Sequence, residues 1–111
     1  MQLEKFLITS SASLREALRR IESNQHGMVF VMDDDRAVCA VVTDGDIRRW
    51  LLNGGTLDDV ITRCANTDYV WESPATPRER LLKKLDHRIR LIPLLDAARR
   101  LVGLVSRDHI P

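Results

Sequence analysis

Two polar residues, Thr43 and Asp46, follow an apolar, β-branched run and are the strongest candidates for chemistry in this chain of 111 residues. A helix is expected to begin there, so the Asp46 carboxylate could accept charge-assisted hydrogen bonds from both hydroxyls of a ribose. Thr43 and the free N–H groups of the helix start could face a phosphate, which the positive end of the helix dipole attracts. Arg49 follows on a neighbouring helical face and could reach the same phosphate. Together these groups could hold a ribonucleotide.

A purely structural interpretation of these residues stays open. Threonine followed three residues later by an acid is also the pattern of a capping box, in which both side chains satisfy N–H groups that the first helical turn leaves unpaired. Arg48 and Arg49 fit a solvated helix face better than a phosphate site. Taken alone, the motif favours a helix cap; its place in the repeat described below makes ligand contact an equal alternative.

The composition argues against several other classes of protein. The chain has 17 basic and 16 acidic residues and a formal charge of +1, so it has no overall field to attract nucleic acid or an anionic membrane. Cys39 and Cys64 lack the spacing of a zinc site, and there is neither a glycine-rich phosphate loop nor a nucleophile with a matched base. We therefore expect no enzyme activity, no metal and no required cofactor.

No segment approaches the roughly 20 uninterrupted apolar residues of a membrane span, and the start lacks the apolar stretch of a secretion signal. A cytoplasmic location is the resulting expectation. With 44% apolar residues the chain can still bury a substantial core.

The elements that must position Thr43 and Asp46 belong to an internal repeat. Residues 27–47 align without a gap with residues 90–110, which pairs Asp33 with Asp96 and Thr43 with Ser106. Each copy predicts a strand, a tight polar turn and a second strand that runs into a helix. In the first copy the strands cover 28–32 and 37–42, and the helix runs from 43 to the glycines at 54–55.

A helix is predicted before each hairpin as well. In the first copy Ser13 precedes one apolar helical face and Glu16 follows three residues after this cap, and in the second copy Thr76-Pro77 supplies a helix start. Residues 56–61 predict a short capped helix between the copies. The pattern β-α-β-β-α thus occurs twice, with repeat 1 at 1–55, a connector at 56–67 and repeat 2 at 68–111. Each half has too little sheet to bury its own face, so one compact module is expected.

The run from Ala40 to Asp46 (AVVTDGD) resembles the signature that ends the second hairpin strand of cystathionine-β-synthase (CBS) domains. Residues 92–94 (IPL) and 103–106 (GLVS) are similar to parts of the same family pattern in the second copy. The resemblance implies an α+β fold of two repeats packed through their sheets with pseudo-two-fold symmetry. It also implies clefts for adenosine-type nucleotides, assembly into a homodimer, and a base slot near Met28, Val29 and Ile8.

The variant from Thr43 to Arg49 (TDGDIRR) is similar to CBS pairs joined to bacterial sugar-nucleotide enzymes. These are sugar-phosphate nucleotidyltransferases, with the pair at the N-terminus, or arabinose-5-phosphate isomerases, with the pair at the C-terminus. Because the chain starts at Met1 and stops after the second copy, we expect the nucleotidyltransferase arrangement, with the catalytic domain outside this chain. An isomerase tail and a ligand-free dimerisation module are the alternatives.

The second copy departs from the family pattern at the residue that aligns with Asp46, which is His109. A neutral imidazole cannot replace a carboxylate that accepts two hydroxyls. We therefore expect one nucleotide site, in the first repeat, with an adenine or cytidine nucleotide as regulatory ligand.

Overall fold

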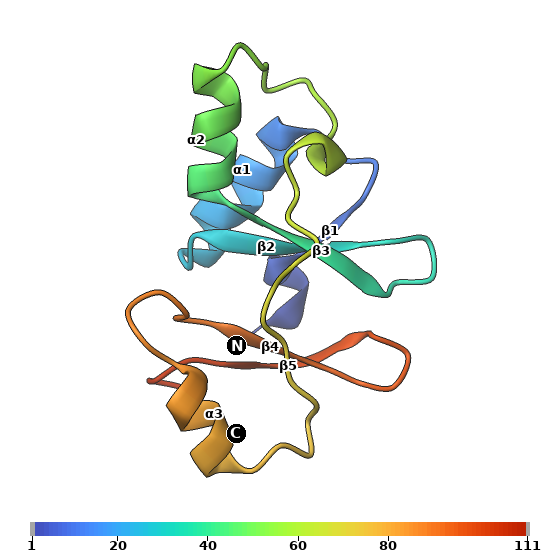
Figure 1. Ribbon diagram of the computed structural model, residues 1–111. Coiled ribbons are helices and arrows are strands. Elements are labelled where there is room, and N and C mark those ends of the chain that lie inside the picture. The colour runs from blue at the N-terminus through green and yellow to red at the C-terminus, as the bar shows by residue number, and fades with distance from the viewer. Residues whose placement is uncertain (1, 111) are drawn as a thin grey trace. The chain divides into compact units, whose positions relative to one another are not determined.

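The computed structural model describes residues 2–110, which form an α+β fold with two small sheets and three α-helices (Figure 1). The predicted fold class is confirmed. The chain divides into two compact units, residues 2–69 and residues 70–110. The repeat boundaries expected from the sequence stay a prediction.

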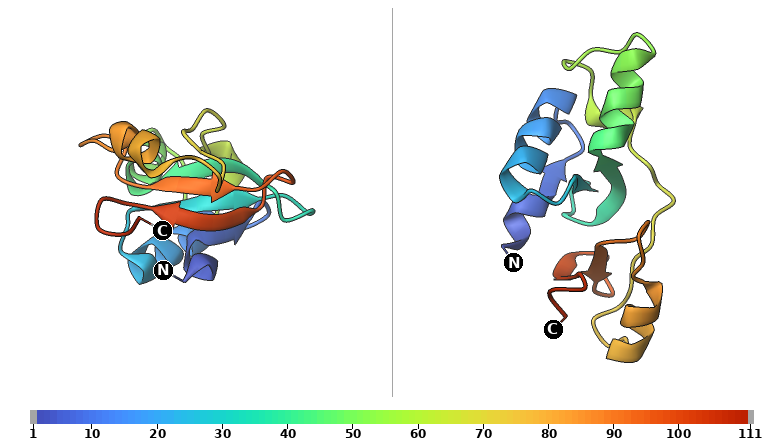
Figure 2. Two further views of the ribbon diagram at one scale, coloured as in Figure 1. Left: turned by 90° about the horizontal axis from the view of Figure 1, so that it is seen from below. Right: turned by 90° about the vertical axis from the view of Figure 1, so that its left-hand side faces the viewer.

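The first unit is a three-stranded sheet covered by two helices. The order is β1 (Leu7–Thr9), β2 (Met28–Met32) and β3 (Val38–Thr43), with β1 parallel and β3 antiparallel to β2. The 3₁₀ turn η1 (Leu3–Phe6) precedes the sheet, α1 (Leu14–Asn24) joins β1 to β2, and α2 (Asp44–Leu52) continues from β3. Figure 2 shows α1 and α2 on the same face of this sheet.

The core of this unit lies between the sheet and its helices. Val29, Val31 and Val42 are fully buried, and because successive side chains of a strand point to opposite faces, these three share the face of the sheet that the helices cover. They pack against apolar residues of α1 and α2 that recur at helical spacing, such as Leu14, Ala17, Ile21 and Ile47. The packing of the buried face of α2 against the sheet therefore fixes the position of this helix.

Both helix starts in the first unit follow the predicted chemistry. The hydroxyl of Ser13 accepts the N–H of Glu16 at 3.2 Å, and Gln25 ends α1 in the left-handed conformation. Thr43 opens α2 as its N-cap. The helix starts predicted from residues 13–16 and 43–46 are therefore confirmed.

The prediction of a capped helix at 56–61 is wrong. The carboxylate of Asp59 accepts the N–H of Thr56 and the indole N–H of Trp50, each at 2.8 Å, and this fixes a single turn followed by the short 3₁₀ helix η2 (Ile61–Arg63). The carbonyls of Leu57 and Asp59 accept N–H groups from the start of α1. Because those carbonyls are already used, they do not propagate a helix through the connector.

The second unit contains one helix and one hairpin. Helix α3 (Arg78–Lys84) packs on strands β4 (Ile92–Leu95) and β5 (Leu101–Val105), which are antiparallel. A single parallel bridge from Glu72 to Leu94 stands where the first unit has β1. Buried residues of the helix and hairpin form the core: Leu81, Leu85, Ile92, Leu94 and Val105.

The two hairpin turns are built alike. Asp33 accepts the N–H of Ala37 at 3.0 Å, and Asp96 accepts the N–H of Arg100 at 3.0 Å. Arg36 and Arg99 each adopt φ 63°, the left-handed conformation that closes the turn. The gapless alignment of the two copies is thus reproduced in three dimensions.

The second copy differs from prediction at its helix starts. The extended ψ of Pro77 leaves it outside α3 as the N-cap, while the Thr76 hydroxyl donates to Glu72 at 3.4 Å. After β5 no helix follows within the described residues, because Ser106 and His109 form a tight turn with reciprocal backbone hydrogen bonds. The predicted β-α-β-β-α pattern is therefore complete only in the first copy.

Candidate functional site

The end of β3 and the start of α2 bring Thr43 and Asp46 into direct contact. The Asp46 N–H donates to Thr43 Oγ1 at 3.1 Å, and the Thr43 N–H donates to Asp46 Oδ2 at 2.9 Å. Both halves of a capping box are therefore made. The carboxylate of Asp46 is only 21% exposed, which places an anion at the edge of the core.

Arg49 reaches back along α2 to the same carboxylate. Its Nη2 donates to Asp46 Oδ1 at 2.8 Å, and the Arg49 side chain is 68% exposed. A Cβ on Gly45 would lie 3.3 Å from a guanidinium nitrogen of Arg49 and 3.7 Å from one of Arg48. Two arginines thus lie over the helix start, where the helix dipole favours anions.

The remaining N–H groups of this helix start already have acceptors inside the chain. The Asp44 N–H donates to Gly27 O at 3.0 Å, and the Gly45 N–H donates to its neighbour Asp44 Oδ1 at 2.8 Å. The expectation of free N–H groups for a phosphate is therefore wrong. The chemistry available to a ligand here is the Asp46 carboxylate, the Thr43 hydroxyl and the two guanidinium groups.

The three apolar candidates divide between this site and the core. Met28 lies directly opposite Thr43 in the β2–β3 register and is half-buried. Val29 is fully buried and Ile8 is 4% exposed, and both belong to the core between sheet and helices. Met28 therefore lies beside Thr43, whereas Val29 and Ile8 belong to the core; base contact by any of them stays a prediction.

Cys64 lies near Asp46, although it is far from Asp46 in the sequence and was not predicted to be part of the site. Burial raises the pKa of its thiol above the ordinary value, and the negative charge of Asp46 raises it further. The residue arrives through the connector, after the short helix η2, so its proximity depends on the tertiary fold. It offers a chemical probe of the charge at Asp46.

The equivalent position of the second repeat has a different construction. The N–H of Ser106 donates to the backbone carbonyl of His109 at 2.9 Å, whereas the N–H of Thr43 donates to the Asp46 side chain. The tight turn therefore replaces both the carboxylate and the helix start. Within residues 70–110, the second repeat therefore has no counterpart of the Thr43–Asp46 pair.

Across residues 2–110, no group of three or more histidine, cysteine or acidic residues is placed to hold a metal ion. The same part of the chain contains no helix with the length and apolar character needed to cross a membrane.

The chain is similar to known proteins in both sequence and fold. The model of the CBS domain family matches residues 3–53 and again residues 57–110. Arabinose 5-phosphate isomerase GutQ of Escherichia coli O6:H1 is 31% identical over 102 residues, which is 89% of this chain and 31% of that protein. The chain thus spans about a third of the length of this curated relative.

Solved structures show the same fold. The CBS domain protein PAE2072 from Pyrobaculum aerophilum, complexed with AMP, matches 90% of this chain and 78% of its own with a TM-score of 0.76 and 24% identity. The CBS domain pair of MJ0100, in complex with 5′-methylthioadenosine and S-adenosyl-L-methionine, matches 93% of this chain and 82% of its own with a TM-score of 0.77 and 19% identity.

Proposed function

Since the chain belongs to the CBS domain family and contains two such domains in tandem, we propose that it is a regulatory module that binds a nucleotide in its first repeat. The observation that carries the proposal is the Asp46 carboxylate, which completes the cap through one oxygen and accepts from the exposed Arg49 through the other. A ribose needs a fixed acceptor of this kind.

Binding would proceed by exchange at Asp46. Ribose hydroxyls would donate to Oδ1 in place of Arg49, whose exposed guanidinium would then turn to the phosphate together with Arg48. The cap through Oδ2 would remain, so the helix start need not unfold. Adenine and cytidine nucleotides are the proposed ligands, and the AMP and adenosine-type ligands named for the two similar structures support the adenine class.

The attached enzyme is proposed from the relatives. Similarity to an arabinose 5-phosphate isomerase favours that class of parent over the nucleotidyltransferase expected from the sequence. In this proposal the module forms a homodimer in the cytoplasm, and nucleotide binding shifts the dimer geometry and with it the activity of the attached domain. Light scattering of the purified chain tests the homodimer, and a monomer at all concentrations contradicts it.

A ligand-free dimerisation module is the second candidate. The completed capping box and the N–H groups already satisfied at the start of α2 favour it, because these residues have a structural role without any ligand. The turn at 106–109 in the second repeat also lacks the helix-start carboxylate of the first repeat.

Isothermal titration with AMP, CMP and GMP separates the two candidates. We expect binding of one of them to the wild-type chain and its loss in Asp46→Asn, which keeps the size of the side chain and removes the charge. Asp58→Asn is the matched control, because Asp58 is an exposed acid of the same unit that pairs with Arg15. No heat with any of the three at millimolar concentration rules out the nucleotide proposal and leaves dimerisation.

A further inference from the structure

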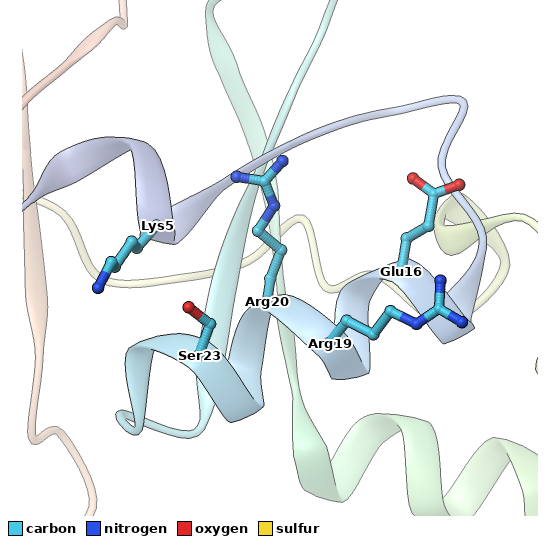
Figure 3. A pocket seen from close by; sticks show the side chains of 5 residues that line it. All are labelled: Lys5, Glu16, Arg19, Arg20 and Ser23. Atoms are coloured by element: carbon cyan, nitrogen blue, oxygen red, sulfur yellow. The ribbon is translucent and has the colours of Figure 1, made fainter.

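A cationic hollow lies on the outer side of α1, and the Thr43–Asp46 motif contributes nothing to it. Figure 3 shows the five side chains that line it: Lys5, Glu16, Arg19, Arg20 and Ser23. Lys5 comes from η1, and the other four come from α1. Glu16, Arg19, Arg20 and Ser23 recur at the three- and four-residue spacing of one helical stripe, so they share a face of α1.

The cations of this hollow lack carboxylate partners. Among residues 2–110, Lys5, Arg19 and Arg20 form no ion pair, whereas Arg15, Arg36, Arg49 and Arg80 each contact an acid. Glu16 is the one acid in the lining, and it contacts none of the three cations within ion-pair distance. The hollow therefore carries an excess of positive charge that no described carboxylate neutralises by contact.

The walls of the hollow are fixed by two hydrogen-bonded links. Arg20 Nη1 donates to the carbonyl of Glu4 at 2.9 Å, which ties α1 to η1 and holds this guanidinium in place. The buried Asn24 amide donates to the carbonyls of Lys5 and Met28, each at 3.0 Å, which fixes the backbone of Lys5. Two of the three cations are thus attached to positions set by the fold, which lowers the cost of gathering them around an anion.

We propose that this hollow binds a phosphate-bearing small molecule. The guanidinium groups of Arg19 and Arg20 and the hydroxyl of Ser23 can donate hydrogen bonds to phosphate oxygens, and the ammonium group of Lys5 adds a positive charge. Three cations gathered at one hollow suit a compact dianion, whereas nucleic acid needs an extended basic surface that a chain of net charge +1 lacks. This site lies on other residues than the proposed nucleotide site and does not depend on it.

Titration with inorganic pyrophosphate tests the site on the full chain. The double variant Lys5→Gln/Arg19→Gln removes two charges from the hollow and leaves the Arg20 and Asn24 links intact. The matched control Arg78→Gln/Lys83→Gln removes two exposed charges from α3, in the other unit. We expect the hollow variant to weaken binding about tenfold and the control to change it less than about twofold. Equal losses in both variants, or no binding by the wild-type chain at millimolar concentration, overturn the proposal.

Two further arms separate the sources of binding. Sodium sulfate at matched ionic strength measures how far salt alone screens the charges of the hollow. A poly-glutamate peptide measures recognition of an acidic protein segment. Tighter binding of the peptide than of pyrophosphate also overturns the proposal. In Asp46→Asn, pyrophosphate binding is expected to persist while nucleotide binding is lost. Failure of one site is therefore distinguishable from failure of the other.

Discussion

The two oxygens of Asp46 serve different partners. Oδ2 accepts the Thr43 N–H and completes the helix cap, while Oδ1 accepts the exposed Arg49 side chain. An exposed ion pair contributes little to stability, typically below about 1 kcal/mol, so a ligand can displace Arg49 at small cost. Helix capping and ligand binding, which compete as interpretations of the sequence, are therefore compatible in the structure.

The cap itself is predicted to stabilise only the first repeat. Thr43→Val keeps the shape of the side chain and removes the hydroxyl that accepts the Asp46 N–H, and we expect it to lower the free energy of unfolding by about 1 kcal/mol. Ser106→Ala is the matched change in the second repeat, where the aligned residue opens no helix, and should cost less than about 0.5 kcal/mol. Chemical denaturation of both variants checks this, and equal costs would contradict the assignment of the cap.

The reactivity of Cys64 reports the charge of Asp46. A negative neighbour disfavours the thiolate and raises the thiol pKa, so Asp46→Asn should lower that pKa and increase the thiolate fraction near pH 8. We expect faster alkylation of Cys64 by iodoacetamide in this variant, measured by peptide mass spectrometry. Cys39, whose pKa is raised by burial and by Asp33, is the internal control and should react at an unchanged rate. Unchanged Cys64 kinetics would contradict the proximity of Asp46.

At the scale of elements, a nearly buried carboxylate anchors α3 to the segment before it. Glu72 is 10% exposed in its side chain and accepts from Lys84 Nζ at 2.5 Å, with Arg80 at 3.7 Å. The hydrogen bond from Lys84 is the main cause that lowers the Glu72 pKa. Since the folded pKa lies below the unfolded value of about 4.3, the contribution to stability is present above that pH and is lost as the pH falls through the folded pKa.

Removing this anchor should destabilise the second unit in a pH-dependent way. We expect Glu72→Gln to lower the free energy of unfolding by about 1 kcal/mol at pH 7, and the difference from wild type to shrink below about pH 4.3. Glu79→Gln, an exposed acid in the first turn of α3, is the control and should change stability by less than about 0.5 kcal/mol at either pH. Urea denaturation at both pH values measures this, and a difference that grows on acidification would reverse the proposed sign.

Elements set by local chemistry were predictable from the sequence, and elements set by distant partners were not. Asp33 and Asp96 carry the information for their own turns, and Thr43 carries the information for the start of α2. The helix predicted at 56–61 does not form because N–H groups at the start of α1 donate to the carbonyls of Leu57 and Asp59. The contact between Thr43 and Asp46 was predictable because it is local in the sequence. The position of Cys64 near Asp46, and that of Lys5 beside the stripe on α1, depend on tertiary packing.

The two repeats differ in more than one residue. The first has a parallel strand, a closing helix and a carboxylate at the helix start, while the described part of the second has a single bridge, a tight turn and His109. In the proposed function, the described residues of the pair therefore offer one helix-start carboxylate, Asp46, as an acceptor for a ribose. Asymmetry of this kind makes the stoichiometry of binding an informative measurement.

We expect one nucleotide per chain, and we expect His109→Asp to leave that number unchanged. An aspartate at 109 restores the aligned residue type, yet the backbone carbonyl of residue 109 would still accept the Ser106 N–H, so no helix start would orient the new carboxylate. Isothermal titration of both chains with the nucleotide that binds best gives the stoichiometry directly. Two sites in the wild-type chain that both persist in Lys5→Gln/Arg19→Gln would show that the second repeat binds through other residues, whereas loss of one in that variant would assign it to the hollow beside α1. A second site gained in His109→Asp would show that a single side chain, rather than the turn, separates the two repeats.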